Sequence, residues 1–250
     1  MTKILMFQGT GSGVGKSVLA AGFCRLLKNR GITVLPFKAQ NMALNSGVTP
    51  EGFEMGRAQI VQAEASKVFP DVRMNPVLLK PQGIGVSQLI RLGKVVGNFS
   101  AKEYYKMAEE NFQIVKKAFD SLKLEADWIV MEGAGSPAEI NLQGTDIVNM
   151  RMAEYAGAKV ILVADIDRGG VFAWLKGTFD LIKDHHRHLL HGMLINKFRG
   201  DVSLLEPGIK QFNEIVPIPM LGVIPWREIK LEDEDSQNLK SHIVSDPKID

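Results

Sequence analysis

The sequence has a single cysteine, Cys24, and it lacks any run of about 18 apolar residues that could span a membrane. One thiol excludes a disulfide within the chain and any metal site built from several cysteines, such as a zinc ribbon. This sparing use of cysteine is typical of a reducing cytoplasm. The N-terminal residues lead directly into a strand-like segment, without the apolar core of a signal peptide. We therefore expect a cytoplasmic protein with no membrane partner.

The chain also lacks an excess of charge of either sign. Its 30 Lys and Arg residues face 28 Asp and Glu residues, which gives a formal net charge of +2, and the basic residues are dispersed. Proteins that bind nucleic acid usually carry a clustered basic surface. The balance of charge predicts no DNA or RNA partner.

What the sequence does contain is a series of short apolar runs. With 250 residues, 45% of them hydrophobic, the chain is long enough to bury one sizeable core. Near-continuous apolar runs are typical of strands buried on both faces, and helical spacing between several of them indicates a strand–helix repeat. The predicted fold is α/β, a mostly parallel sheet with helices on both faces. The predicted strands are Ile4–Phe7, Thr33–Phe37, Trp128–Met131, Val160–Ala164, Met193–Ile195 and Met220–Ile224.

Two segments differ in composition from this repeat. Residues 39–100 are rich in Gly, Asn, Gln and Pro and show weak periodicity, although a helix is expected within Met55–Val68. We interpret this segment as an insertion over a ligand site, the alternative being a long surface excursion. From Leu231 onward the chain becomes acidic and polar. We predict one catalytic unit over residues 1–230 and a linker or tail over residues 231–250.

A glycine-rich loop with the sequence GTGSGVGKS runs from Gly9 to Ser17, between a predicted strand and a predicted helix. In phosphate-binding loops of this kind the backbone N–H groups and the helix N-terminus cradle phosphates, a lysine reaches the outer phosphates, and a hydroxyl binds Mg²⁺. Lys16 and Ser17 occupy those two places. The common spacing puts the first glycine where this chain has Thr10, which indicates a subclass. The residues predicted to contact the nucleotide are Thr10, Gly11, Ser12, Gly13, Val14, Gly15, Lys16 and Ser17.

Acidic residues follow two of the predicted strands. Ligands of open parallel sheets gather at the carboxyl ends of the strands. Glu132, directly after Met131, is therefore predicted to hold Mg²⁺ together with Ser17, the alternative being an ordinary capping acid. Asp165 and Asp167 lie in a segment with an arginine and two glycines. That segment fits either a phosphate or carboxylate site or a turn with a local ion pair.

Other candidates carry less information. Asn196 and Pro225 follow or end the last two strands and are placed to frame the nucleotide base, with the asparagine offering a donor and an acceptor to adenine. A purely structural role fits them equally well. Lys38 and Lys80 are candidates for neutralising substrate carboxylates. Four histidines cluster within residues 185–191, and we interpret them as part of a solvated surface because no further metal ligand is evident.

Several longer blocks resemble one known family, the cobyric acid synthases, and the resemblance extends over about residues 3–236. Ala39 stands where that family is expected to have proline, and Gly11 and Gly13 replace other small or polar residues. None of these differences removes a reactive group. The blocks that carry the resemblance are Gly9–Ser17, Pro36–Ser46, Gly56–Gln59, Asn75–Pro81, Glu132–Asn141 and Asp165–Ala173.

The resemblance implies a P-loop NTPase-like fold, similar to that of dethiobiotin synthetase, and an ATP-dependent synthetase domain. Its corrinoid substrate would be adenosylcobyrinic acid a,c-diamide, amidated at the b, d, e and g carboxylates with ATP, Mg²⁺ and ammonia from glutamine. Each carboxylate would attack the γ-phosphate of ATP, and ammonia would displace phosphate from the resulting acyl phosphate. Asp146 matches a family acid near the reacting centre, so Lys16, Lys38 and Asp146 are the implied catalytic residues. The implied substrate-binding residues are Gln40, Asn41, Lys80, Ser136 and Asn141.

The family's glutaminase half has a cysteine nucleophile in a sharp strand-to-helix turn, whereas Cys24 lies within a predicted helix. We expect ammonia to come from a separate glutaminase domain or subunit, and this chain alone to use free ammonia but not glutamine. Whether it forms a homodimer is left open. A dethiobiotin synthetase is one rival interpretation, disfavoured by the Gln40–Gln59 block and the Asp165–Gly170 segment. A nucleotide-switched partitioning or scaffold ATPase is another, disfavoured because Gly11 stands where those proteins carry an additional lysine.

Overall fold

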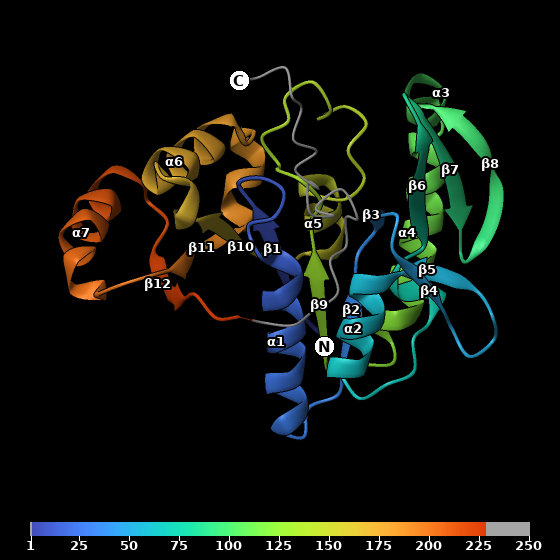
Figure 1. Ribbon diagram of the computed structural model, residues 1–250, viewed down its shortest axis with the longest axis horizontal. Helices are drawn as coiled ribbons and strands as arrows, with labels where there is room; N and C mark the ends of the chain where they lie inside the picture. The colour runs from blue at the N-terminus through green and yellow to red at the C-terminus, as the bar shows by residue number, and fades with distance from the viewer. Residues whose placement is uncertain (1, 229–250) are drawn as a thin grey trace, which may run out of the picture.

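The computed structural model describes residues 2–228 and places a parallel six-stranded sheet at the centre of the protein (Figure 1). The strand order is β12-β11-β10-β1-β9-β2, and every neighbouring pair is parallel. Each strand contains all or most of one of the predicted apolar runs, so the predicted α/β sheet is confirmed. The strands are β1 (Lys3–Gly9), β2 (Val34–Phe37), β9 (Trp128–Glu132), β10 (Lys159–Asp165), β11 (Leu190–Phe198) and β12 (Met220–Pro225).

The sheet is covered by helices on both faces. Along β1, Leu5 and Phe7 join the core under helix α1 (Lys16–Asn29), while Ile4 and Met6 join the larger core on the opposite face. Successive strand residues point to opposite faces, so burial of both faces explains why the run is apolar throughout. The larger core includes residues of helices α4 (Ala108–Lys123), α5 (Met150–Ala156), α6 (Val171–Leu181) and α7 (Glu206–Ile215).

Helix α1 is amphipathic, with one face buried against the sheet. Ala20, Cys24 and Leu27 are buried against the sheet, and Cys24 is 0% exposed. The residue after the helix C-cap, Gly31, has φ +75°, a left-handed conformation that glycine adopts without the strain of a side chain. The predicted helix after the loop is thus confirmed, and Cys24 packs within it as a small buried side chain.

Residues 39–100 contain more regular structure than their weak periodicity indicated. They form a second, four-stranded sheet of order β3-β6-β7-β8, together with a two-stranded sheet and a helix inside the expected range. Helices α3 and α4 lie behind the four-stranded sheet in Figure 1. The elements are β3 (Gln40–Met42), β4 (Ser46–Val48), β5 (Glu54–Gly56), α2 (Arg57–Ala65), β6 (Val77–Gly83), β7 (Val86–Arg91), β8 (Lys94–Ser100) and, directly after them, α3 (Ala101–Lys106).

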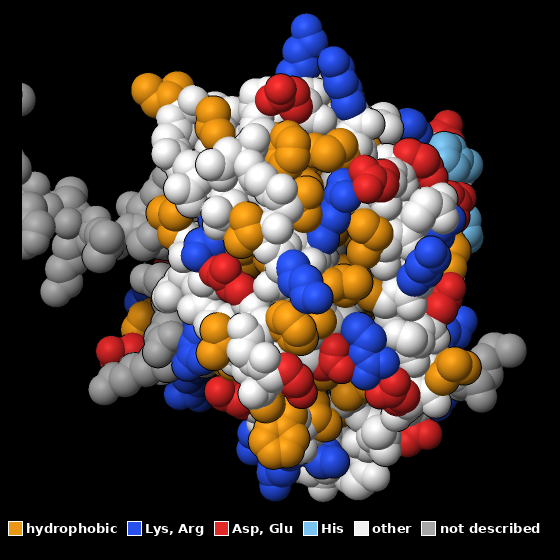
Figure 2. Space-filling view, turned by 90° about the vertical axis from the view of Figure 1, so that its right-hand side faces the viewer, with side chains coloured by type: hydrophobic (Ala, Val, Ile, Leu, Met, Phe, Trp, Pro, Cys, Tyr) orange, Lys and Arg blue, Asp and Glu red, His pale blue; other side chains and the backbone are white. Residues whose placement is uncertain are grey.

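A tight turn joins β7 to β8. Arg91 pairs with Lys94, and the two residues between them, Leu92 and Gly93, have φ +45° and +77°. Two left-handed residues in a row are the signature of the hairpin turn whose twist matches that of the strands. Figure 2 shows this side of the molecule, where apolar, acidic and basic side chains are intermixed on the surface.

Short 3₁₀ helices connect several elements: η1 (Val72–Met74), η2 (Ile166–Arg168), η3 (Asp184–Leu189) and η4 (Val202–Leu204). The predicted acidic linker or tail, residues 231–250, lies outside the described residues. Within residues 2–228, no helix combines the length and the apolar character needed to cross a bilayer.

Candidate active site

The glycine-rich loop joins β1 to α1 at the carboxyl end of the sheet, as predicted. Gly13 and Gly15 have φ +71° and +99°, and a Cβ on Gly15 would lie 2.2 Å from the Asn196 side-chain nitrogen. Lys16 is 6% exposed and donates hydrogen bonds to the carbonyl oxygens of Gly11 at 2.8 Å and Gly135 at 3.1 Å. Its ammonium group therefore lies between the loop and the turn that follows β9.

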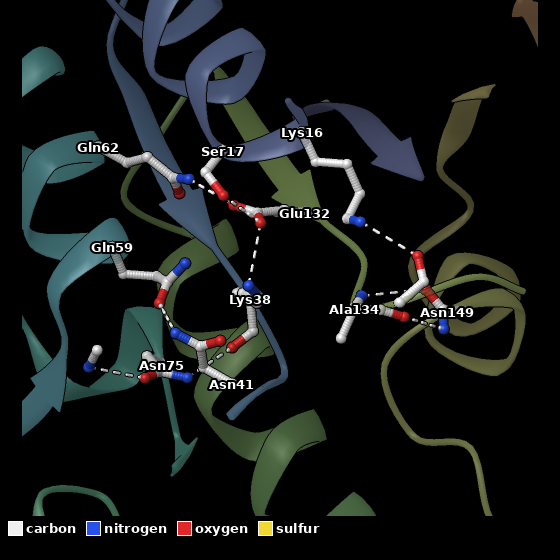
Figure 3. A network of polar contacts seen from close by, with 12 residues as sticks. Lys16, Ser17, Lys38, Asn41, Gln59, Gln62, Asn75, Glu132, Ala134 and Asn149 are labelled. Atoms are coloured by element: carbon white, nitrogen blue, oxygen red, sulfur yellow. Dashed lines mark hydrogen bonds and ion pairs between the residues drawn. The ribbon is translucent and has the colours of Figure 1, made fainter. Parts of the chain in front are cut away.

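Glu132 joins this loop to two other parts of the chain. The register of β1 and β9 pairs Phe7 with Glu132, so the acid lies beside the point where β1 enters the loop. Its Oε1 accepts hydrogen bonds from Ser17 Oγ at 2.7 Å and Lys38 Nζ at 3.0 Å (Figure 3). Its Oε2 accepts one from Gln62 Nε2 at 2.6 Å. Glu132 is 1% exposed, and the cation and donors around it satisfy a charge that would be costly to bury alone.

The backbone around Lys38 is held by the insertion. The Lys38 N–H donates to Met74 O at 2.8 Å, and Asn75 Nδ2 donates to Lys38 O at 3.2 Å. Asn75 also accepts from the Gly56 N–H at 3.0 Å. Neighbouring Asn41 donates to Gln59 Oε1 at 3.1 Å. Buried amides thus link β3, β5 and α2 to the segment that carries Lys38 (Figure 3).

The turn after Glu132 is fixed by Asn149, which the sequence did not single out. Asn149 accepts from Ala134 N at 3.2 Å and donates to Ala134 O at 2.8 Å. A Cβ on Gly133 would lie 2.3 Å from Asn149 Oδ1, so glycine is required for this close approach. Gly135 follows with φ +57°. The glycine-rich sequence was a visible signal for the turn, but the residue that braces it comes from a separate segment.

Asp146 lies in the segment that leads into α5. Its Oδ1 accepts hydrogen bonds from Val148 N at 2.8 Å and Asn149 N at 3.0 Å. Burial raises the pKa of this carboxyl above its ordinary range, against the opposing effect of the backbone N–H donors. Asp146 therefore organises the backbone of a segment that faces the cavity.

The ends of β10 and β11 brace the other side of the loop. Lys197 Nζ donates to Gly13 O at 2.7 Å and to Asp165 Oδ2 at 2.8 Å. Asn196 Nδ2 donates to Val14 O at 2.8 Å, and Asn196 is 7% exposed. In the structure, Asn196 thus contacts the loop backbone. This contact is a structural role, which the sequence had left open as an alternative to nucleotide binding.

Asp167 and Pro225 lie further out at this edge. Asp167 pairs with Arg199 at 3.1 Å, and the Arg199 guanidinium lies 4.0 Å from the ring centroid of Trp226. Pro225 pairs with Phe198 at the end of β12. The Asp165–Asp167 segment, in the structure, is a turn in which Asp165 pairs locally with Arg168 at 3.7 Å, while Lys197 and Arg199 pair with its two acids from the end of β11.

A cavity of about 650 Å³ connects the loop to the insertion, a size typical of small-molecule sites. Its lining includes residues predicted to bind phosphate, to bind the metal and to act in catalysis, together with some of the residues predicted to bind substrate. The predicted site residues that line it are Ser12, Gly13, Gly15, Lys16, Ser17, Lys38, Gln40, Asn41, Glu132, Ser136 and Asp146. The predicted site residues outside its lining are Thr10, Gly11, Val14, Lys80, Asn141, Asn196 and Pro225.

Lys80 and Gln40, both predicted to bind substrate, have partners within the protein. Lys80 pairs with Glu54 at 2.5 Å and bonds Ser46 Oγ at 3.2 Å, away from the cavity lining. Gln40, which lines the cavity, accepts a hydrogen bond at Oε1 from the Tyr104 hydroxyl. The positive charge of Lys80 is thus balanced by Glu54, whose pKa is lowered by the Lys80 contact although burial opposes it.

The histidine cluster separates in the structure. His188 and His191 bond nearby backbone carbonyl oxygens, whereas His185 and His186 lie beside Glu154, with candidate ligand atoms within 4.8 Å of one another. His186 lies 3.5 Å from Glu154. Burial and neighbouring His185 lower the pKa of His186, which favours its neutral form. The group lies on α5 and η3, outside the cavity lining.

The donors at the loop suit a hard cation. The Ser17 hydroxyl and the Glu132 carboxylate supply oxygen atoms 2.7 Å apart. Mg²⁺ is usually held by one or two carboxylates together with phosphate oxygens and water rather than by a complete protein cage. Among residues 2–228 no group of three or more His, Cys, Asp or Glu side chains gathers around Glu132. The donor set therefore fits a metal shared with a bound nucleotide.

Comparison with known proteins supports a nucleotide site. Residues 5–239 match the model of the CobQ/CobB/MinD/ParA nucleotide binding domain. A cobyric acid synthase of Yersinia enterocolitica is 55% identical over 241 residues, covering 96% of this chain and 47% of the relative. One of Listeria innocua is 54% identical over 239 residues, covering 96% and 47%. The chain thus spans about half the length of the curated relatives it matches.

Among solved structures, the signal recognition particle receptor FtsY of Elizabethkingia anophelis is similar in fold. It is 15% identical, with a TM-score of 0.51, and the match covers 92% of this chain and 61% of that one. At this identity the similarity supports the fold alone. It agrees with the parallel sheet and glycine-rich loop described above.

Proposed function

Because this chain belongs to the CobQ/CobB/MinD/ParA nucleotide-binding domain family, we propose that it is the ATP-using synthetase unit of a cobyric acid synthase. Its substrate would be adenosylcobyrinic acid a,c-diamide, amidated at the b, d, e and g carboxylates to give adenosylcobyric acid. The observation that carries the proposal is the shared cavity, where the phosphate loop meets Lys38, which follows β2, and Gln40 and Asn41 of the insertion. A phosphoryl donor and a carboxylate acceptor can both be held there.

The loop side of the cavity would bind ATP. Backbone N–H groups from Thr10 to Ser17 would surround the phosphates, and Lys16 would neutralise charge on the transferred phosphoryl group. Ser17 and Glu132 would hold Mg²⁺, which supplies positive charge between the phosphates. Lys38, which pairs with Glu132 at 3.0 Å in the structure, would neutralise the substrate carboxylate as it approaches.

The chemistry requires two displacements. A carboxylate oxygen of the corrinoid attacks the γ-phosphorus, and the bond from that phosphorus to ADP breaks. Ammonia then attacks the acyl carbon, loses a proton and releases phosphate, leaving an amide. Asp146 lines the cavity together with Ser136, and we assign it the orientation of the substrate or the incoming ammonia.

The ammonia source and the assembly are further parts of the proposal. We assign the supply of ammonia to a glutaminase domain or subunit, since the single cysteine, Cys24, is buried within α1. Burial raises its pKa to about 12, which keeps it a thiol rather than a nucleophilic thiolate at neutral pH. A cytoplasmic location fits this chemistry, and the assembly as a monomer or a homodimer stays open.

Product mass tests the function directly. The chain is incubated with ATP, Mg²⁺, ammonium and adenosylcobyrinic acid a,c-diamide, and the corrinoid is analysed by mass spectrometry. We expect a series of products in which successive carboxyl groups have become amides, with one ADP formed per amide. Glutamine in place of ammonium should give no product with this chain alone.

Matched lysine variants of α1 control the assay. Lys16→Ala should lower the rate by about 100-fold or more, because a cation at the phosphates is lost. Lys28→Ala, in the last turn of the same helix, should retain the rate.

ATP hydrolysis stimulated by DNA or a membrane, without any change in the corrinoid, would instead support a switch ATPase.

A further inference from the structure

Helix α2 buries a face that contains amide side chains. Gln59 and Gln62 are each 0% exposed and lie three residues apart, on the same side of the helix. Burying an amide costs free energy unless hydrogen bonds compensate for the lost water. Packing alone does not explain two glutamines in these positions. The partners of both lead toward the candidate active site.

Gln62 reaches the acid at the end of β9. Its Nε2 donates to Glu132 Oε2 at 2.6 Å, across 70 residues of sequence. The other oxygen of Glu132, Oε1, accepts from Ser17 at 2.7 Å and Lys38 at 3.0 Å. The two carboxylate oxygens therefore have different environments: Gln62 holds one, and the other faces the phosphate loop (Figure 3).

The orientation of the Gln62 amide follows from this contact. An ionised carboxylate only accepts hydrogen bonds, so the NH₂ end of the amide must face Glu132. The Oε1 end then points away, and it has no hydrogen-bond partner within the part of the chain that the structure describes. Leaving a buried carbonyl oxygen without a partner is unfavourable. The Gln62 side chain thus keeps its contact with Glu132, although its Oε1 atom has no hydrogen-bond partner among the described residues.

We propose that Gln62 is a positioning residue for Glu132, holding its Oε2 so that Oε1 stays directed at Ser17 and the bound metal. This inference rests on the proposed role of Ser17 and Glu132 in binding Mg²⁺. Without the Gln62 donor, Glu132 can turn both oxygens toward Lys38 and leave Ser17. The insertion, through α2, thereby sets the geometry of the metal ligand as well as lining the cavity.

Metal dependence of nucleotide binding tests the proposal. Gln62→Met keeps the length and approximate shape of the side chain but removes the donor. Binding of a fluorescent ATP analogue is measured over a series of Mg²⁺ concentrations and in EDTA. Outer partners of metal ligands typically contribute about 10- to 100-fold to metal affinity. We expect the half-saturating Mg²⁺ concentration to rise by about that factor, with affinity in EDTA unchanged.

Two further variants separate positioning from folding. Gln59→Met removes the other buried glutamine of the same helix face, whose partner is Asn41, and should leave the Mg²⁺ dependence as in the wild type. Gln62→Leu also removes the donor while retaining the approximate size of the side chain, and should shift the Mg²⁺ dependence in the same direction as Gln62→Met. Thermal unfolding confirms that each variant is folded before binding is measured.

A double-mutant cycle with Glu132→Gln supplies the decisive comparison. If Gln62 acts through Glu132, adding Gln62→Met to Glu132→Gln should change the Mg²⁺ response no further. Additive effects, a wild-type Mg²⁺ response in Gln62→Met, or an equal loss of affinity with and without Mg²⁺ would each overturn the proposal. None of these measurements uses a corrinoid or ammonia. A failure of the amidation proposal would therefore leave their outcome interpretable.

Discussion

Glu132 shows how far single residues of this site can be predicted. Its place after a buried strand, beside a phosphate loop, indicated the contact with Ser17, and the structure has that contact at 2.7 Å. Its contacts with Lys38 and Gln62 lie 94 and 70 residues away in sequence. No local pattern encodes such partners, because they depend on how the insertion folds over the sheet. Asn149 was not singled out either, because its contact with Ala134 joins two segments 15 residues apart.

Asp146 gives a prediction at this scale. In Asp146→Asn the side-chain oxygen can still accept from Val148 N and Asn149 N, which it does now at 2.8 Å and 3.0 Å. The fold should survive, whereas the negative charge is lost. We expect amidation to fall by about 100-fold, as when a reacting group loses its orientation. An unchanged rate for every amidation would remove Asp146 from the catalytic set.

The stability of Asp146→Asn should depend on pH in a defined direction. Because burial raises the pKa of Asp146 in the folded protein, the folded state favours the protonated acid. Stability from that preference is present below the unfolded pKa and is lost as pH rises through the folded pKa. At neutral pH the variant should therefore have a melting temperature equal to or above that of the wild type. The difference should disappear on acidification, as followed by thermal unfolding at several pH values.

At the scale of elements, the strands buried on both faces could be predicted from the sequence, whereas the strands within residues 39–100 could not. The central strands are continuous apolar runs between turn signals, so their burial is visible in sequence. In β6, Pro81 and Gly83 interrupt the pattern, and β8 contains Gly97. Such residues are typical of loops as well as of bulged edge strands. The hairpin turn at Leu92 and Gly93 lacks the Asn-Gly or Asp-Gly pair typical of such turns, so the sequence did not mark it clearly.

The phosphate loop gives a prediction at the same scale. Gly15 has φ +99°, and an added Cβ would lie 2.2 Å from Asn196. Gly15→Ala should therefore lower the free energy of unfolding by about 2 kcal/mol or more, since the left-handed backbone alone costs about 1–2 kcal/mol for a residue with a Cβ. Gly11 has no positive φ, and a Cβ there would meet nothing within 4 Å.

Gly11→Ala is accordingly the matched control for stability. Urea unfolding of both variants beside the wild type measures the difference. Similar unfolding free energies for Gly15→Ala and Gly11→Ala would show that the loop can relax around a Cβ at position 15. In that case the close approach of Asn196 would not constrain the sequence.

At the scale of the whole molecule, the cavity is built jointly by two parts of the fold. The central sheet and the segments that follow its strands supply the phosphate loop, Lys38 and Glu132, and the insertion supplies Gln40 and Asn41. The sequence predicted that residues 39–100 cover a ligand site, and the lining of the cavity agrees with that interpretation. It did not predict that the insertion would also contact the candidate metal ligand. Changes in the insertion that alter the Gln62 contact with Glu132 should consequently affect nucleotide binding.

Because Cys24 is buried, the rate at which a reagent labels its thiol measures how often the protein opens. The thiol lies in the core under α1, the helix whose first turn carries Lys16 and Ser17. It can react with a thiol reagent only when this region opens, so the labelling rate reports the population of the open state.

We expect negligible labelling of the native protein and one label per chain after denaturation. Nucleotide at about 100 times its Kd should slow native labelling about 100-fold, because ligand stabilises the closed state. Rapid labelling that ATP does not slow would contradict this linkage. Labelling that slows by the expected factor would allow ligand affinity to be measured from the labelling rate of the single thiol.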